Sequence, residues 1–596
     1  MSYKAPLKDI DWALKHVVGL SRVNSLPHFA EATDDLVDAV LEEAGKFAEG
    51  VLDPLNHSGD MQGCSWKDHE VTTPDGWVEA YQQFVEAGWM QLSATTDFGG
   101  QGLPYLVGAC VNEMWKSANM AFSLCPLLSH GAIEAVTAHG SDALKAKYLE
   151  KMIEGVWTGT MNLTEPQAGT DLAALKSKAV PEGDHYRISG QKIFITYGEH
   201  GMAENIMHLV LARLPDAPEG VRGISLFLVP KFMVNDDGSL GERNDLRCVS
   251  IEEKLGIHGS PTCVMSFGDN GGAIGYLIGE EHKGLACMFT MMNAARHAVG
   301  MEGYALSERA YQRALAYAMD RVQGPAMLAG SGGSRTIVNH PDVRRMLMDM
   351  KSRTEAMRML AFEAAASYDI AEATEDEAAR KFHQRRGELL TPLVKGWCTE
   401  TAQKITYLGM QVHGGMGFIE ETGAAQHYRD ARITTIYEGT TGIQANDLIG
   451  RKMARDGGEG LQELGAEIEA TAEALSSSSD ERLQLMGAQL ATANEQVGEV
   501  AQWLLGNDQP HQASGAAVSL LMAMGTLVGG WLQGRSALAA VEALANGASD
   551  KSFLEAKIGL AQYFAGTALP EVASFGAAAI QGGELVDVLS EEQLLG

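Results

Sequence analysis

The chain has 596 residues, 45% of them hydrophobic and 21% charged, proportions that are typical of a folded globular protein and exclude a largely disordered one. Acidic residues outnumber basic ones by 77 to 46, and the net charge of −31 disfavours binding to nucleic acid or to an anionic membrane surface. The seven cysteines include no CxxC pair, so we expect neither a disulfide framework nor a zinc site, and we expect a cytoplasmic location.

The first half of the chain changes its hydrophobic pattern once. Residues 1–33 form a charged N-terminal extension without the apolar core of a signal peptide. From 34 to 157, apolar residues recur at spacings of three and four, which predicts an N-terminal α-helical domain. Residues 158–273 consist of short β-prone runs between turns rich in Gly, Pro and Asp, and they predict an antiparallel, barrel-like middle domain.

The second half is predicted to be helical throughout. Long helical periodicities across 274–450, one of them starting at Pro341, predict an antiparallel four-helix bundle. Residues 451–596 predict an additional C-terminal helical domain with 7 basic and 19 acidic residues. Within it, the apolar stretch 516–532 predicts a buried helix, with a membrane-associated hairpin as the alternative. The fold class is therefore mainly α with a central β domain.

Five short segments carry the candidate chemistry, and each of them is unspecific when taken alone. A single Thr-Glu-Pro turn, a basic residue at a helix end or one glutamate in a loop usually has only a structural role. The signatures GxGxxG, GxxxxGK[ST], HExxH and GxSxG are absent. The segments are MNLTEPQAGTDL (161–172), KIFIT (192–196), RVQG (321–324), QVHGGMGF (411–418) and IYEGTTGIQ (436–444).

In this order and spacing, the segments resemble those of the acyl-CoA dehydrogenase family of flavoproteins. The resemblance covers roughly residues 35–450 and extends to DFGGQGLP (97–104), EEKLGIHGSPTC (252–263) and HPDVRRML (340–347). The chain length and the extra C-terminal domain resemble a long bacterial branch of the family. That branch includes dehydrogenases of 3-methylmercaptopropionyl-CoA, which serve dimethylsulfoniopropionate breakdown.

The resemblance implies that Glu438 is the catalytic base, with Arg296 beside it in the active site. Removal of a Cα proton from a thioester needs a carboxylate that is shielded from water, and Glu438 stands between an aromatic residue and a glycine. Some relatives carry the base on another helix, where this chain has Ala295, which cannot serve. The substrate-binding residues implied are Thr170, Arg222, Asn293, Arg296, Tyr437, Glu438 and Gly439.

The cofactor implied is FAD, and no metal site is expected. Two of the residues, Arg321 and Gln323, resemble side chains that reach the flavin of a neighbouring subunit. This chain departs from the family at Phe194, where many members have Trp, and at Gly442, where Gln is commoner. The implied FAD-binding residues are Met161, Leu163, Thr164, Gly169, Thr170, Phe194, Ile195, Thr196, Arg321, Gln323, Gln411, Gly415 and Thr440.

The function implied is FAD-dependent oxidation of an acyl-CoA to its trans-2-enoyl-CoA, with 3-methylmercaptopropionyl-CoA among the candidate substrates. The resemblance also implies electron-transferring flavoprotein as the electron acceptor and a homo-oligomer, a dimer rather than a tetramer, with neither nucleic acid nor membrane as partner. Three alternatives share the fold. They are a fatty acyl-CoA dehydrogenase of β-oxidation, soluble or membrane-bound, an acyl-CoA oxidase, and a DNA-associated relative, which the acidic C-terminal domain disfavours.

Overall fold

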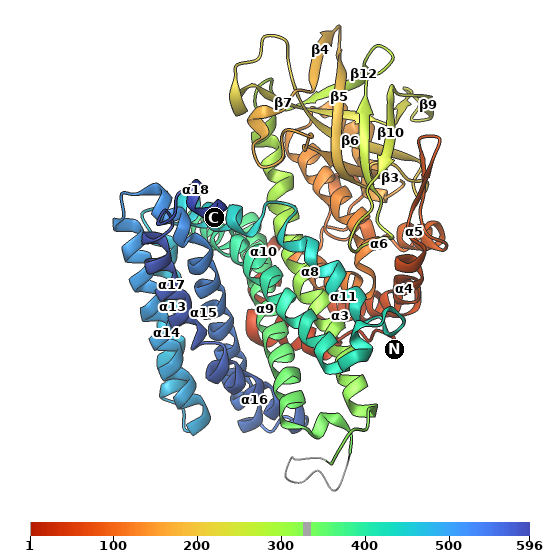
Figure 1. The fold of residues 1–596 in the computed structure, drawn as a ribbon. Helices are drawn as coiled ribbons and strands as arrows, with labels where there is room; N and C mark the ends of the chain where they lie inside the picture. Colours follow the sequence, from red (N-terminus) through yellow and green to blue (C-terminus); the bar gives the residue numbers. More distant parts are fainter. Residues whose placement is uncertain (1, 326–334) are drawn as a thin grey trace.

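The computed structural model describes residues 2–325 and 335–596. A β domain stands at one end of a helical body, and the C-terminal helices lie along one side of that body (Figure 1). The long helix α8 (Gly284–Asp320) starts beside the β domain and runs to the far end of the bundle (Figure 1). Its 37 residues span about 55 Å, so this one helix connects the β domain to the far end of the bundle.

The N-terminal region is helical, as the periodicity predicts. The side chain of Thr33 accepts a hydrogen bond from the backbone N–H of Leu36 and so caps α3. A small hairpin of β1 (Ser65–Lys67) and β2 (Glu70–Thr72) was not predicted. The helices are α1 (Leu7–Asp11), α2 (Ser21–Asn24), α3 (Asp34–Phe47), α4 (Asp53–Gln62), α5 (Trp77–Glu86), α6 (Tyr105–His139) and α7 (Asp142–Glu154).

The β domain is built on one eight-stranded sheet in the order β10-β11-β5-β12-β7-β6-β3, with β4 paired to β5. Its neighbours are antiparallel, as predicted, except that β3 runs parallel to β6 and one residue pair of β4 does so too. The last strand extends to Ile278, past the predicted boundary at 273. The strands are β3 (Trp157–Asn162), β4 (Lys178–Glu182), β5 (His185–Thr196), β6 (Asn205–Arg213), β7 (Ile224–Pro230), β8 (Phe232–Val234), β9 (Leu240–Arg243), β10 (Leu246–Ile251), β11 (Thr262–Phe267) and β12 (Ala273–Ile278).

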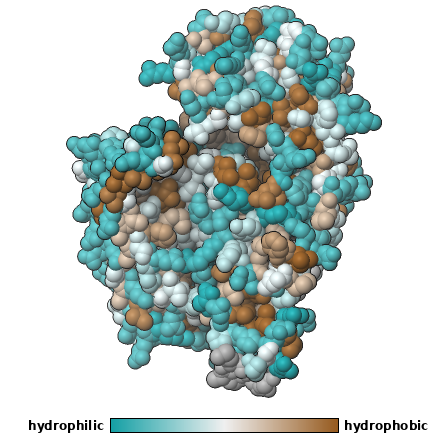
Figure 2. All heavy atoms as spheres, in the orientation of Figure 1, coloured by the Kyte–Doolittle hydropathy of each residue, from teal (hydrophilic) through white to brown (hydrophobic). Residues whose placement is uncertain are grey.

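Three long helices dominate the bundle. Besides α8 these are α9 (Pro341–Ala373), which starts at the proline as predicted, and α10 (Glu377–His413). The short helices α11 (Ala424–Ala431) and α12 (Thr441–Asp447) follow and pack against α10. The face in Figure 2 is hollowed where the β domain meets this helical body, and apolar side chains lie around the hollow.

The C-terminal helices pack against the bundle, chiefly through α15. Among the described residues, two helices, α6 and α15, are long and apolar enough to cross a membrane. In the most apolar 18-residue segment of each, 83% and 78% of the residues, respectively, are buried inside the protein. The stretch 516–532 lies in α15, so the prediction of a buried helix is confirmed. The helices are α13 (Glu459–Ser476), α14 (Glu481–Gly506), α15 (Pro510–Ala545), α16 (Lys551–Thr567), α17 (Glu571–Glu584) and α18 (Glu591–Leu595).

The N-terminal extension joins these helices to the bundle. Asp9 accepts hydrogen bonds from Lys351 of α9, at 2.5 Å, and from Lys557 of α16, at 2.6 Å. The indole N–H of Trp12 donates to the hydroxyl of Ser536 on α15, at 2.8 Å. The first residues of the chain are therefore part of the interface between the bundle and the last helices.

Candidate active site

Glu438 lies in a strained loop between the 3-10 turn Arg432–Thr435 and α12. Its φ is +54° and that of Gly439 is +89°, so two successive residues adopt left-handed conformations, which for a glutamate is uncommon. The side-chain amide of Gln444 holds the loop by donating to the carbonyl oxygens of Glu438 and Gly439, at 3.2 and 3.4 Å. The backbone N–H of Glu438 donates to no other described residue. Strain of this kind is often found at functional sites.

The charges around Glu438 come from two helices. Burial raises the pKa of its carboxyl, while the positive charges of Arg296 on α8 and Lys395 on α10 lower it. The Arg296 guanidinium is 5% exposed and donates to Asp447 of α12, at 3.4 Å, and its Nε has no hydrogen-bond partner among the described residues. A carboxyl that is shielded from water and faced by cations can exist as a base and can also hold a proton.

Sequence reasoning missed a second buried carboxyl next to this loop. The hydroxyl of Tyr437 donates to Glu302 of α8, which is fully buried. Burial raises the pKa of Glu302 to about 7, while the neighbouring charge of Lys116 lowers it. A signal was present in the sequence, because Lys116, Glu302 and Lys395 are charged residues on apolar faces of predicted helices, where a charge needs a partner.

In the β domain, the two segments predicted to bind flavin lie side by side. The Ile193 N–H donates to the Thr164 carbonyl, at 2.9 Å, and the Thr160 hydroxyl donates to the Thr196 carbonyl, also at 2.9 Å. Phe194 has a φ of +61° and a side chain that is 59% exposed. The aromatic ring is therefore left uncovered beside two threonines. The two segments contain eight of the predicted residues, namely Met161, Leu163, Thr164, Gly169, Thr170, Phe194, Ile195 and Thr196.

Four of the predicted FAD residues of the bundle, Arg321, Gln323, Gln411 and Gly415, lie at the other end of α8. Arg321 and Gln323 directly follow its last turn, and the ring of Tyr317 near that end stacks on His413 at the end of α10, with centroids 4.4 Å apart. Gln411 and Gly415 flank His413 in sequence. Within one chain, the predicted flavin residues therefore form two groups, which are separated by most of the length of α8 (Figure 1).

The other predicted site residues fall in different places. Thr440 caps α12 and shares the loop of Glu438. Asn293 is exposed on α8, one turn before Arg296, and Ala295 between them is buried. Arg222 is exposed on a 3-10 turn of the β domain and makes no contact with the group around Glu438, so its substrate role stays a prediction.

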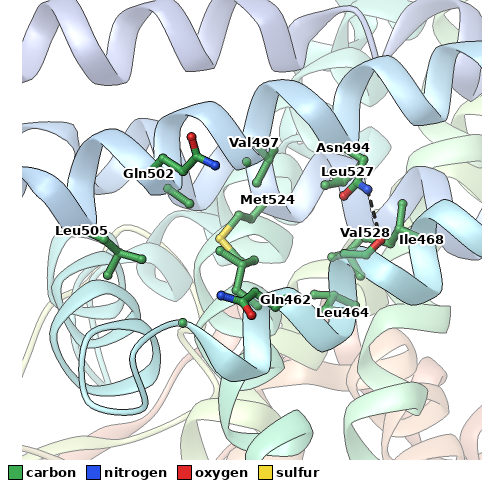
Figure 3. Close-up of a pocket in the computed structure, with 15 residues that line it drawn as sticks. Gln462, Leu464, Ile468, Asn494, Val497, Gln502, Leu505, Met524, Leu527 and Val528 are labelled. Atoms are coloured by element: carbon green, nitrogen blue, oxygen red, sulfur yellow. Dashed lines mark hydrogen bonds between the residues drawn. The ribbon is translucent and has the colours of Figure 1, made fainter.

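A cavity of about 240 Å³ lies elsewhere, between α13, α14 and α15 (Figure 3). Its walls are mostly aliphatic, with Met524 and Leu527 of α15 facing Leu464 and Ile468 of α13. None of the residues that line it belongs to the predicted site. The predicted site therefore does not coincide with this cavity.

The fold and this loop match one protein family over almost the whole chain. The family models for the acyl-CoA dehydrogenase N-terminal, middle and C-terminal domains match residues 36–156, 160–270 and 282–453, and the model described as acetyl-CoA dehydrogenase C-terminal like matches 464–587. The chain belongs to the acyl-CoA dehydrogenase family, and it is an oxidoreductase that uses FAD.

Two relatives and one solved structure span nearly the same length as this chain. The 3-methylmercaptopropionyl-CoA dehydrogenase of Ruegeria pomeroyi is 50% identical over 574 residues, 96% of this chain and 97% of the relative. A butyryl-CoA dehydrogenase of Syntrophomonas wolfei is 34% identical over 590 residues, 96% of each chain. An acyl-CoA dehydrogenase from Bacillus anthracis, solved in complex with FAD, superposes with a TM-score of 0.74 at 20% identity, covering 100% of this chain and 94% of the other.

The residues of the β domain fit a flavin. An isoalloxazine ring system needs an apolar surface and hydrogen-bonding groups at its edge, and the exposed ring of Phe194 next to Thr196 offers both. At the far end of α8, a side chain at Gly414 or Gly415 would meet no atom within 4 Å, which leaves open space beside the glycines. We therefore expect the β-domain group to hold the ring and the far group to contact another flavin.

Proposed function

We propose that this chain oxidises 3-methylmercaptopropionyl-CoA at its Cα–Cβ bond, forming the trans-2-enoyl thioester. The observation that carries the substrate is the 50% identity to the Ruegeria pomeroyi enzyme over 96% of the chain. The reaction removes a proton from Cα and a hydride from Cβ, and bound FAD supplies the acceptor for the hydride. Electron-transferring flavoprotein is the proposed final acceptor, and the proposed location is cytoplasmic.

In this proposal, Glu438 takes the Cα proton. Its backbone N–H, which no described residue occupies, binds the thioester carbonyl oxygen and so acidifies that proton. Arg296 keeps the carboxylate ionised before the reaction, and burial then favours the protonated form. The loop is fixed by Gln444 through backbone oxygens only, so the carboxyl remains free for substrate.

We also propose that the enzyme works as a homodimer in which each flavin contacts two chains. Arg321 is too far along α8 to reach the β domain of its own chain. Exposed apolar side chains surround this end of the bundle, among them Met319 at 58% and Phe418 at 81%, which is typical of an interface. The extra C-terminal helices cover another face of the bundle, which disfavours a tetramer.

A mixing experiment tests this arrangement. Chains with Glu438→Gln and chains with Arg321→Ala are each expected to be inactive, whereas mixed dimers regain turnover, because one of their two sites receives both native residues. Sedimentation then reports a dimer with one FAD per chain. No regain of turnover in verified mixed dimers, or a flavin-loaded monomer, would reject the shared site.

The substrate is tested by a dye-reduction screen across acyl-CoA thioesters. The expected result is the highest kcat/KM for 3-methylmercaptopropionyl-CoA, with pentanoyl-CoA as the isosteric control in which carbon replaces sulfur. A higher kcat/KM for butyryl-CoA would favour the second candidate, a short-chain dehydrogenase of β-oxidation, which the 34% identical Syntrophomonas wolfei enzyme supports. Rapid peroxide formation without any carrier would favour an oxidase instead.

A further inference from the structure

Helices α8 and α10 cross closely directly behind the loop of Glu438. A Cβ at Gly300 would lie 2.5 Å from the carbonyl oxygen of Val394, and a Cβ at Gly303 would lie 2.7 Å from that of Cys398. Only glycine allows two helix backbones to approach so closely. The crossing is therefore fixed, and the side chains next to its two contact points have little freedom to move.

Two of those side chains are charged and fully buried. Lys395 follows Val394 on α10, and Glu302 precedes Gly303 on α8. The ammonium of Lys395 and one oxygen of Glu302 have no hydrogen-bond partner among residues 2–325 and 335–596. A buried ammonium without a hydrogen-bond partner is costly for the stability of the fold, so its presence calls for an explanation.

The charged groups that act on Lys395 come from α8, from α10 itself and from the loop of Glu438. Burial lowers the pKa of Lys395 to about 8, and the carboxylates of Glu438, Glu302 and Glu400 raise it, while Arg296 lowers it. The charge of Lys116 on α6 acts on Glu302 as well. At pH values below 8 the ammonium is therefore charged, and Glu438 is the neighbour that dominates its interactions.

The same crossing holds the catalytic loop. Tyr437, the residue before Glu438, donates its hydroxyl to Glu302. The loop is thus tied to α8 through a side chain, while the unpaired ammonium comes from α10. A cation at this position acts on the carboxylate without forming a hydrogen bond that substrate binding would have to break.

We propose that Lys395 is a positioning residue for proton abstraction: its buried ammonium, enclosed where α8 crosses α10, keeps Glu438 ionised and ready to accept the Cα proton. This inference rests on the proposed role of Glu438 as the base. Arg296 alone does not keep Glu438 ionised, since Asp447 already neutralises part of the charge of Arg296, and Lys395 supplies the further positive charge.

The direction of the effect follows from charge. A positive group favours the carboxylate, so its loss raises the pKa of Glu438, and a higher pH is then needed to ionise the base. We expect Lys395→Met to move the acid limb of the kcat/KM profile upward by about one pH unit. At a pH below the limb this is about a tenfold loss of kcat/KM, and the loss disappears above it.

The experiment measures kcat/KM for 3-methylmercaptopropionyl-CoA with a dye acceptor against pH, together with FAD content and thermal unfolding. Lys395→Met and Lys395→Gln remove the charge, and Lys395→Arg keeps it and is expected to keep the native limb. The matched control is Lys381→Met, because Lys381 lies on the same helix, is exposed and pairs with the exposed Glu377 one turn away.

Each result decides the question. An upward shift in both neutral variants, absent from the Arg and control variants, supports the positioning role. A loss that is equal at every pH, or neutral variants that fail to fold while the Arg variant folds, shows a structural role and overturns it. If Glu438→Gln retains full turnover, the proposed base itself is wrong. If that variant is inactive and the limb of Lys395→Met is unmoved, only the role of Lys395 is rejected.

Discussion

Replacing Glu438 by Gln tests the active site most directly. The amide keeps the shape of the side chain and removes the base, and each of three nearby carboxyls among the described residues already has a partner. Glu302 is engaged by Tyr437, Glu400 accepts from Thr441 at 2.6 Å, and Asp447 pairs with Arg296 at 3.4 Å. We therefore expect the whole contribution of general-base catalysis to be lost, at least about 10⁴-fold in kcat, or about 5 kcal/mol in the barrier.

The variant should still bind FAD and acyl-CoA. Gln444 holds the loop through backbone oxygens, and the backbone N–H at 438 is unchanged. The assay is the rate at which substrate bleaches the flavin in a stopped-flow instrument, because this step needs no electron acceptor. Bleaching at close to the wild-type rate would refute the assignment of the base. Glu421→Gln, at an exposed position, serves as the control and should leave the rate unchanged.

Two further predictions concern the packing of the C-terminal helices. In Gly525→Ala, the new Cβ would lie 2.2 Å from Cγ of Trp397, so we expect a loss of about 1 to 3 kcal/mol in the free energy of unfolding and a lower thermal midpoint. In Lys557→Met, the carboxylates of Asp9 and Glu355 lose a buried partner at 2.6 and 3.0 Å, and we expect a loss of about 3 kcal/mol, measured in the same way.

Both controls lie on α16. A side chain at Gly559 would meet no atom within 4 Å, so Gly559→Ala should be neutral or stabilising by up to about 1 kcal/mol. Lys551→Met changes an exposed lysine at the start of the helix and should change the midpoint little. If Gly525→Ala and Lys557→Met unfold at the same temperature as these controls, the packing of the C-terminal helices does not contribute to stability in the way proposed.

The sequence predicts well what local chemistry decides. The serine run at 476–480 separates α13 from α14, and Pro341 starts α9, because capping and proline geometry act within a few residues. The hairpin of β1 and β2 was missed because its strands are three residues long and mostly exposed, so they show no alternation. Its turn places Asp68 and His69 at positive φ, a conformation that their residue types do not predict.

The residues of the candidate site also differ in whether local sequence predicts them. Glu438 and the flavin segments were predicted from the sequence because their motifs are contiguous. Lys395 and Glu302 were not, because they are 93 residues apart in the chain and the sequence of neither helix indicates that they meet where the helices cross. Partners of this kind depend on which helix faces which, and a single sequence contains that information only as unexplained charges on apolar faces.

The position of the N-terminal extension has a consequence for the order in which the protein can assemble. Trp12 and Ser536 are separated by 524 residues, and Asp9 and Lys557 by 548. At a synthesis rate of roughly 5 to 20 residues per second, the first segment leaves the ribosome about half a minute to two minutes before its partners exist. During that time Trp12 lacks its partners Ser536 on α15 and Phe553 on α16. The N-terminal extension can therefore complete this interface only after α15 and α16 have been made.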